Sequence, residues 1–172
     1  MKSAAASFRA EGVKGATIPG IMERAELTVG GFYKHFGSKS ELFQEIVRTA
    51  MDRTRDQLRR IPETGRAWRS AAAAVYLSKA HRQNMEGGCP IPALAPDIAR
   101  SDEDTRHTFE EAISDLVDDI ATRMDTGDAT RDREAAWAFI STQVGGLTLA
   151  RAMADDALAA EVLRACRHEL AR

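Results

Sequence analysis

The chain has 172 residues, of which 44% are hydrophobic and 6% aromatic, and its formal net charge is −2. No run of about 18 apolar residues and no charged-then-apolar leader occurs, so we expect neither a membrane span nor a signal peptide. Alanine is abundant and no segment alternates like a strand, which predicts an all-α protein of about nine helices.

Three short helices are predicted at the start of the chain, at residues 3–11, 17–25 and 28–36. The first stops at Gly12, a residue type that commonly ends helices. The second starts at Thr17, whose hydroxyl can cap it, and Pro19 follows near its first position. A tight break at residues 25–27 separates it from the third helix, which starts at another capping hydroxyl, Thr28.

The third helix has an apolar face and a polar face. Val29, Phe32 and Phe36 share the apolar face. The opposite face carries no acid and consists of Gly30, Gly31, Tyr33, Lys34 and His35. A helix this short is stable only when its neighbours clamp it. The arrangement is typical of a helix-turn-helix whose second helix lies in the major groove of DNA.

This stretch resembles the DNA-binding domain of the TetR/AcrR family of bacterial transcriptional regulators. The residues that carry the resemblance are Gly12, Thr17, Ile18, Ile21, Ala25, Leu27, Thr28, Gly30, Phe32, Tyr33, His35, Phe36, Lys39 and Leu42. It implies an N-terminal DNA-binding domain over residues 1–47 and a helical effector-binding and dimerisation domain over residues 48–172.

Only the second half of the family's first helix is present. We therefore expect a truncated start, from a misplaced start codon or an incomplete record. A naturally short variant with weakened DNA binding is the alternative.

The resemblance also implies roles at the DNA surface. The expected phosphate contacts are Thr17, Thr28, Tyr33, His35 and Lys39. The residues placed to reach base edges are Val29, Gly30, Gly31 and Lys34, and Lys34 is the one able to address guanine. Core packing is the alternative for Tyr33, and a helix-end cap is the alternative for His35.

The later helices are predicted at residues 40–61, 66–84, 93–100, 102–124, 131–153 and 155–170. Ser40 is expected to cap the first of these, which would join the DNA end to the rest of the chain. The strongest loop signal covers residues 86–92 and contains Cys89. A sensor thiol at Cys89 is an alternative to a small buried side chain there, and we expect Cys166 to be packed on a helix.

Charge and cysteine content add two expectations. Residues 1–60 hold 11 Lys/Arg and 7 Asp/Glu, a net +4, whereas residues 61–172 hold 13 and 19, a net −6. A positive end suits a phosphate backbone, although the arginines at 53, 55, 59 and 60 could equally form a solvated helix face. Unpaired cysteines far apart favour a reducing cytoplasm.

One recognition helix covers few bases, so a homodimer on two half-sites is predicted. The predicted seam comprises Trp137, Ile140, Val144, Gly145, Gly146, Leu158 and Val162. Two glycines inside a helix cost about 1 kcal/mol each relative to alanine, which the close approach of a partner helix would offset. An intramolecular contact is the alternative.

The family also implies a pocket for an unidentified small-molecule effector. Its candidate residues are Trp68, Tyr76, Met85, Cys89, His107, Phe109 and Phe139, for which core packing is an equal alternative. The implied function is a sequence-specific regulator, a repressor that its effector releases from a double-stranded DNA operator. A family member that has lost DNA binding and acts as a ligand- or protein-binding dimer is the alternative.

Enzyme activity, a cofactor and a metal site are not expected. His107 and Glu111 could share a helix face, but the second Glu-x-x-His motif of a di-metal carboxylate bundle does not occur.

Overall fold

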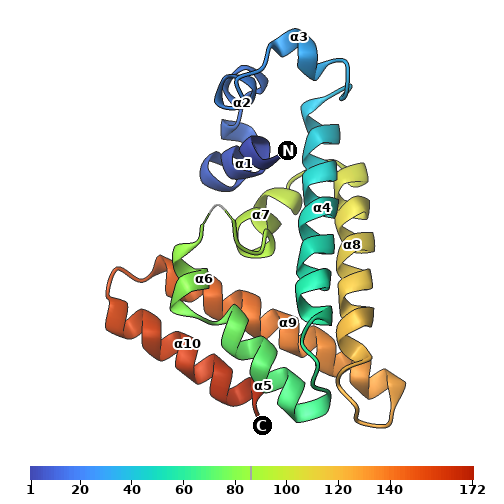
Figure 1. Ribbon diagram of the computed structural model, residues 1–172, viewed down its shortest axis with the longest axis vertical. Helices are drawn as coiled ribbons and strands as arrows, with labels where there is room; N and C mark the ends of the chain where they lie inside the picture. The colour runs from blue at the N-terminus through green and yellow to red at the C-terminus, as the bar shows by residue number, and fades with distance from the viewer. Residues whose placement is uncertain (86) are drawn as a thin grey trace. The chain divides into compact units, whose positions relative to one another are not determined.

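The computed structural model describes residues 1–85 and 87–172 of the chain. These residues form ten α-helices and no β-strand (Figure 1), which confirms the all-α prediction. The predicted loop at 86–92 is described except for Glu86, which lies outside the described residues. None of the described helices is long and apolar enough to cross a lipid bilayer.

The helix beyond the predicted nine comes from a break inside the segment 66–84. The residue that follows α5 (Gly65–Tyr76) leaves the helical region, with φ −90° and ψ 45°. Ser78 then caps α6 (Lys79–Gln83), because its hydroxyl oxygen accepts a hydrogen bond from the His81 amide. A serine hydroxyl can compete with helix carbonyls for a backbone amide, so the segment folds as two helices.

The described helices form two compact units. Unit 1 comprises residues 1–52 and 85–112, and unit 2 comprises residues 53–84 and 113–172. This division differs from the domain boundary predicted after residue 47. The reason is that α7 (Ile91–Ile98) and the start of α8 (Glu103–Ala121) pack with the N-terminal helices.

Unit 1 contains α1 (Lys2–Gly15), α2 (Ile18–Arg24), α3 (Val29–Phe32), the first part of α4 (Lys39–Arg59), α7 and the start of α8. α1 packs against α2 and α7, and the rings of Phe8 and Phe43 meet at 5.1 Å in the core of the unit. The stop predicted at Gly12 is a kink. With φ 72° and ψ 171° this glycine interrupts α1, which then resumes as far as Gly15.

Ser38, and not Ser40 as predicted, caps the first turn of α4. The Ser38 hydroxyl oxygen accepts a hydrogen bond from the Glu41 amide at 3.1 Å, and the Glu41 carboxylate accepts one from the Gly37 amide at 2.6 Å. This pair resembles a capping box, in which a hydroxyl and an acid three residues apart satisfy the first amides of a helix. The hydroxyl of Ser40 instead bonds to side chains near the start of α8.

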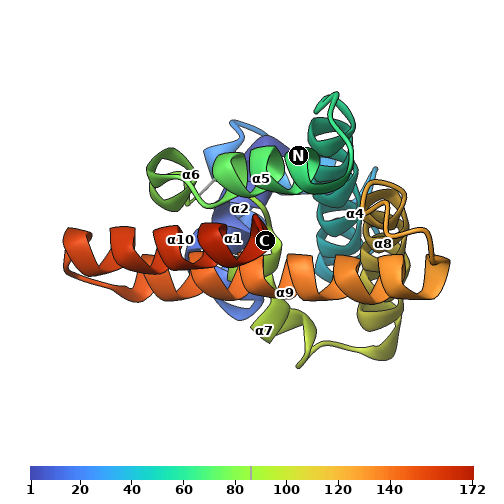
Figure 2. The same ribbon diagram turned by 90° about the horizontal axis from the view of Figure 1, so that it is seen from below.

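Unit 2 is built around α9 (Ala129–Ala152) and α10 (Asp156–Leu170), which lie side by side and run in opposite directions (Figure 2). The carboxylates of Asp128 and Asp155 cap the two helices by accepting hydrogen bonds from backbone amides. α5 packs against both helices, and the buried rings of Trp68 and Phe139 meet at 5.4 Å.

The two adjacent glycines of α9 have different surroundings, which corrects the predicted seam. A Cβ at Gly146 would lie 2.7 Å from Cys166 Sγ and 3.3 Å from Leu77 Cδ2, so this glycine packs on α10 and the end of α5 in its own chain. Ile140 is buried as well. Gly145 is exposed, and no described atom lies within 4 Å of a Cβ at its position.

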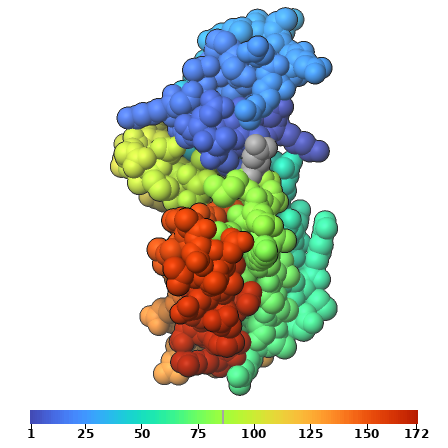
Figure 3. All heavy atoms as spheres, turned by 90° about the vertical axis from the view of Figure 1, so that its left-hand side faces the viewer, coloured from blue at the N-terminus to red at the C-terminus, as the bar shows by residue number. Residues whose placement is uncertain are grey.

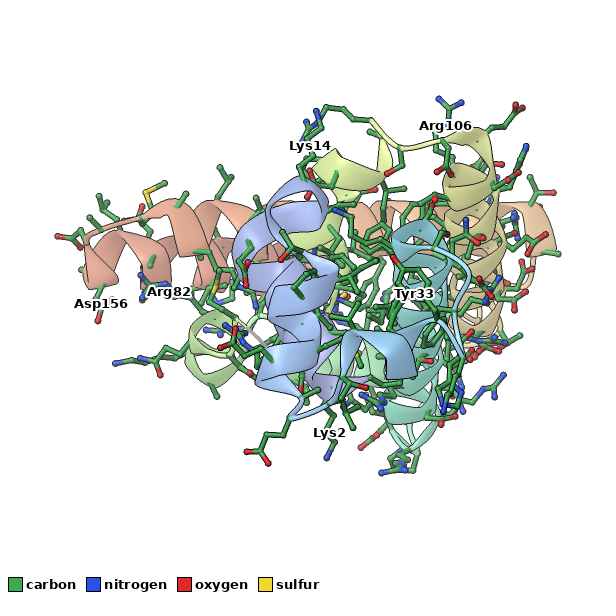
Figure 4. All side chains as sticks on the ribbon, turned by 90° about the horizontal axis from the view of Figure 1, so that it is seen from above. Lys2, Lys14, Tyr33, Arg82, Arg106 and Asp156 are labelled. Carbon is green, nitrogen blue, oxygen red and sulfur yellow. The ribbon has the colours of Figure 1, made fainter. Side chains whose placement is uncertain are left out.

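Arginine side chains cap the C-terminal ends of two helices in unit 2, α6 and α9. Arg82 of α6 donates hydrogen bonds to two carbonyl oxygens at the end of α9 and pairs with Asp156 (Figure 4). Arg151 of α9 donates in return to three carbonyl oxygens at the end of α6. The last carbonyls of a helix lack partners within it and carry partial negative charge, so each guanidinium stabilises the other helix.

We expect unit 2 to lose stability in mild acid because of His81. Burial and the charge of Arg151 lower the pKa of His81 below its ordinary value of 6.5, although its hydrogen bond with the Tyr76 carbonyl acts in the opposite direction. Unfolded chains therefore bind a proton at this histidine more readily than folded ones. Stability is lost as the pH falls below about 6.5.

Thermal unfolding followed by circular dichroism at about pH 7.5 and about pH 5.5 checks this expectation. The Tm of the wild type should drop further on acidification than the Tm of His81→Gln. His168→Gln, at an exposed position on α10, serves as the control and should behave like the wild type. Equal drops in all three proteins would contradict the prediction.

Candidate nucleic-acid interface

Two short helices with capped starts form the predicted helix-turn-helix. The Thr17 hydroxyl oxygen accepts a hydrogen bond from the Gly20 amide, and that of Thr28 accepts one from the Gly31 amide, both at 3.2 Å. Between the helices, Glu26 adopts a φ of 57° and turns the chain sharply. These observations confirm both predicted caps and the predicted break.

α3 is shorter than predicted, because it ends at Phe32 and not at Phe36. The amides of His35 and Phe36 both donate to the Phe32 carbonyl in the turn that follows. Two of the four residues of α3 are glycines, and each glycine weakens a helix by about 1 kcal/mol relative to alanine. Tyr33, Lys34 and His35 therefore lie on a turn beyond the C-terminal end of α3.

Phe32 anchors α3 in the core of unit 1. Its side chain is buried, and its ring lies 5.0 Å from that of Tyr33 and 5.7 Å from that of Phe36. Val29, which was predicted to share this inward face, is 40% exposed. One buried ring thus fixes the helix and leaves most of its surface uncovered.

Most residues predicted to contact DNA are exposed on these two helices and the adjoining turns. The exposed ones are Thr17, Thr28, Val29, Gly30, Tyr33, Lys34 and His35, and Gly31 is half-exposed. Tyr33, labelled in Figure 4, is 60% exposed at the end of α3. No described atom lies within 4 Å of a Cβ at Gly30, so its backbone is open to close approach.

Lys39 is placed differently, since its ammonium group contacts the backbone of its own unit. Nζ donates hydrogen bonds to the carbonyl oxygens of Val13 and Ala16 at 2.8 and 3.0 Å. Two of its three donor positions are thereby used. The sequence gives no signal for these contacts, because the acceptors are backbone atoms 26 and 23 residues away.

Two arginines of the predicted basic cluster on α4 are bound to α8 within unit 2. Arg55 pairs with Asp115 at 2.9 Å and with Asp119 at 2.7 Å, and Arg59 pairs with Asp119 at 2.8 Å. Burial alone would raise the pKa of Asp119, but the hydrogen bonds and charges of both arginines outweigh it and lower this pKa. These side chains therefore do not form a freely solvated helix face.

The predicted effector residues of unit 2 lie in or beside its core. Trp68 and Phe139 are buried in contact, and the ring of Tyr76 lies 4.6 Å from that of His81. Gln143, one helical turn beyond Phe139, is also buried. Among the described residues, neither its Nε2 nor the Trp68 Nε1 has a hydrogen-bond partner. Periodicity alone could not single out Gln143, because this residue lies on an otherwise apolar face of α9.

The predicted effector residues of unit 1 are Met85, Cys89, His107 and Phe109. Cys89 is buried and Phe109 is half-buried, whereas Met85 and His107 are exposed. Contacts with Glu110 and Glu103 hold His107 on the surface of α8, where they raise its pKa, so it lines no enclosed pocket. Within the described ranges, no three His, Cys, Asp or Glu side chains gather as a metal site would require.

The start of the chain matches a known family. Residues 1–46 fit the model of the bacterial regulatory proteins of the tetR family. A TetR transcriptional regulator from Chloroflexus aurantiacus J-10-FL is 27% identical, with a TM-score of 0.80 over 99% of this chain and 89% of that one. Residues 1–46 therefore match the TetR family, and the whole chain shares the fold of a TetR transcriptional regulator.

Two further solved structures share the fold of this chain. Escherichia coli NemR in its reduced form has a TM-score of 0.82 and 15% identity, over 98% of this chain and 93% of that one. AibR, solved with isovaleryl coenzyme A and operator DNA, has a TM-score of 0.60 and 14% identity, over 93% of this chain and 91% of that one. Among curated proteins, none matches this chain in sequence.

Proposed function

We propose that this TetR-family protein is a repressor that binds double-stranded operator DNA through α3 and the turn that follows it. The observation that carries the proposal is a capped helix anchored by one buried ring, Phe32, with its remaining side chains exposed. Such a helix can enter the major groove. Val29, Gly30, Gly31 and Lys34 would then reach base edges, and Lys34 can donate to guanine O6 and N7.

Phosphate contacts are proposed for Thr17, Thr28, Tyr33 and His35. Each threonine hydroxyl already accepts a hydrogen bond from a backbone amide, so its own proton remains to donate to a phosphate oxygen. Lys39 is proposed to contribute indirectly, because its hydrogen bonds to carbonyls fix the end of α1.

A homodimer is proposed because one short helix covers too few base pairs for specific recognition. On α9 and α10, Trp137, Leu149 and Leu158 are 41%, 54% and 53% exposed, and Val144, Gly145 and Val162 are also at least partly exposed. The outer surface of α10 is open beside α5 (Figure 3). Large exposed apolar side chains on two adjacent helices favour burial against a second copy of the chain.

A small-molecule effector is proposed to bind in unit 2 and to release the DNA. The support is the pair of buried donors, Trp68 Nε1 and Gln143 Nε2, that have no acceptor within the described part of the chain. Buried donors without partners are costly, so an effector with carbonyl or carboxylate oxygens would be stabilised there. A ligand shifts the equilibrium only if it binds the released state more tightly.

We expect variants at Lys34 and Tyr33 to affect DNA binding in different ways. The probes are a duplex that the protein enriches from a random pool and a scrambled duplex of equal composition. Lys34→Ala should cost about 1–3 kcal/mol on the enriched duplex and relax the preference at one base pair. Tyr33→Ala should weaken binding to both duplexes alike, because a phosphate contact is independent of sequence.

Fluorescence anisotropy titrations at several salt concentrations measure both effects. Lys2→Ala removes a lysine from the exposed start of α1 and is the matched control, expected to leave the sequence preference intact. If Lys34→Ala loses affinity equally for both duplexes, the proposed contact of Lys34 with bases is wrong. A wild-type protein that enriches no sequence would favour the alternative of a family member without DNA binding.

A further inference from the structure

The geometry points to Asp97 of α7 as a positioning residue for DNA recognition. Through a hydrogen bond to the backbone of residue 13, it fixes the turn from which the helix-turn-helix departs. Asp97 lies well outside the residues that match the family model, yet it belongs to the same compact unit as α1, α2 and α3. The inference rests on the proposed function, because its consequence is a change in DNA affinity.

The kink at Gly12 makes this contact possible. Because Gly12 leaves the helical conformation, the next amide, that of Val13, donates to Asp97 Oδ2 at 2.9 Å. A Cβ at Gly12 would lie 2.9 Å from the same carboxylate oxygen, so a larger residue could not let Asp97 approach. The side chain of Asp97 is only 20% exposed, and a hydrogen bond to a poorly solvated carboxylate is stronger than one between neutral groups.

Lys39 binds the backbone carbonyl oxygens of the same turn. Asp97 accepts the amide proton of Val13, and the ammonium group of Lys39 donates to the carbonyl oxygens of Val13 and Ala16. An anion on the N–H side and a cation on the C=O side match the polarity of the peptide backbone. The turn is therefore clamped between α7 and the first residue of α4.

The segment between α7 and α8 is also attached to the start of α4. The Ser40 hydroxyl lies 2.9 Å from Asp102 Oδ2 and 3.1 Å from Thr105 Oγ1, and Gln44 donates to the same threonine at 3.3 Å. Asp102 also accepts a hydrogen bond from the Thr105 amide, and hydrogen bonds from the side chain and amide of Thr105 and from Ser40 lower the pKa of Asp102. The position of Asp97 relative to α4 is thus set by a network within unit 1.

A cleft of about 300 Å³ borders this junction, lined by the turn, the start of α4 and the end of α7. The polar contacts of Asp97 and Lys39 with the turn lie at the edge of this cleft. Ala16 directly precedes Thr17, the cap of α2, and α2 and α3 have only seven and four residues. Helices this short take their orientation from their attachments. Loosening the turn should therefore alter the orientation of α3.

The test is to titrate Asp97→Ala with the enriched and scrambled duplexes, using the full chain. We expect the affinity for the enriched duplex to fall about tenfold and that for the scrambled duplex to change by less than about twofold. Asp97→Asn, which keeps an acceptor oxygen, should recover part of the loss. Amide exchange at Val13 should be faster in Asp97→Ala than in the wild type, whereas the helical circular dichroism stays the same.

Glu111→Ala is the charge-matched control, because this exposed glutamate of α8 carries the same charge in the same unit. If Asp97→Ala binds the enriched duplex as tightly as Glu111→Ala does, the inference is overturned. Equal losses on both duplexes would also overturn it, since they indicate general destabilisation. A wild-type protein that enriches no duplex would instead refute the proposed function, which is a distinct result.

Discussion

Replacing Leu158 with glutamate is expected to make the protein monomeric and to lower its affinity for the enriched duplex about a thousandfold. Leu158 is 53% exposed on α10, in the surface proposed to meet a second copy. A symmetric interface would bury the new carboxylate twice, at roughly 2 kcal/mol or more per copy. Because two linked half-sites supply the specific affinity, affinity for the scrambled duplex should fall much less.

Sedimentation velocity and DNA titration on the same samples measure this outcome. Val75→Glu is the matched control: Val75 is 67% exposed on α5, a helix that is not part of the surface proposed on α9 and α10, and its variant should remain dimeric. Retained helical circular dichroism in both variants would exclude unfolding as the cause. A Leu158→Glu protein that sediments as a dimer would rule out α10 as the seam.

The two adjacent glycines of α9 are expected to respond to alanine in opposite directions. Gly145→Ala should stabilise the fold of each chain by about 0.5–1 kcal/mol, because no described atom of the same chain lies within 4 Å of a Cβ there and alanine favours the helix. Gly146→Ala should destabilise it, because a Cβ 2.7 Å from Cys166 Sγ forces α9 and α10 apart. Overpacking lowers the free energy of unfolding by about 1–3 kcal/mol, and the higher helix propensity of alanine than of glycine offsets about 1 kcal/mol of this loss.

Urea unfolding of the two single variants and of the double variant Gly146→Ala/Cys166→Ala measures these effects. Removing the Cys166 sulfur should restore part of the stability that Gly146→Ala loses, since the close contact disappears. Gly146→Leu should unfold unit 2 and not merely separate a dimer, because Leu77 is also within 3.3 Å. If both alanine variants raise the stability, the contact between these helices is looser than described.

Local chemistry makes some of these features predictable from sequence. Thr17 and Thr28 cap their helices through amides three residues away, a spacing that the sequence displays directly. Ser38 and Ser40 show the limit of this argument. Both hydroxyls lie at the start of α4, and only the path of the backbone decides that Ser38 caps the helix while Ser40 bonds elsewhere.

Features that depend on distant partners could not be predicted in this way. Asp97 bonds to an amide 84 residues away, and no periodicity or motif links the two positions. Gly146 shows a related difficulty. A glycine within a helix indicates that something approaches closely, but the pattern is the same whether the neighbour is a second chain or, as here, the chain's own Cys166.

Arg82 of α6 and Arg151 of α9 each bind the C-terminal end of the other helix, and this affects how the two ends fold. α6 has five residues, and a helix of that length does not persist in an isolated chain. Its last carbonyls are bound by Arg151, and those of α9 are bound by Arg82, which lies on α6 itself. Neither helix end can gain the hydrogen bonds to its last carbonyls before the other helix has formed. We therefore expect the C-terminal ends of α6 and α9 not to fray independently. They should form together late in folding and open together as one cooperative unit.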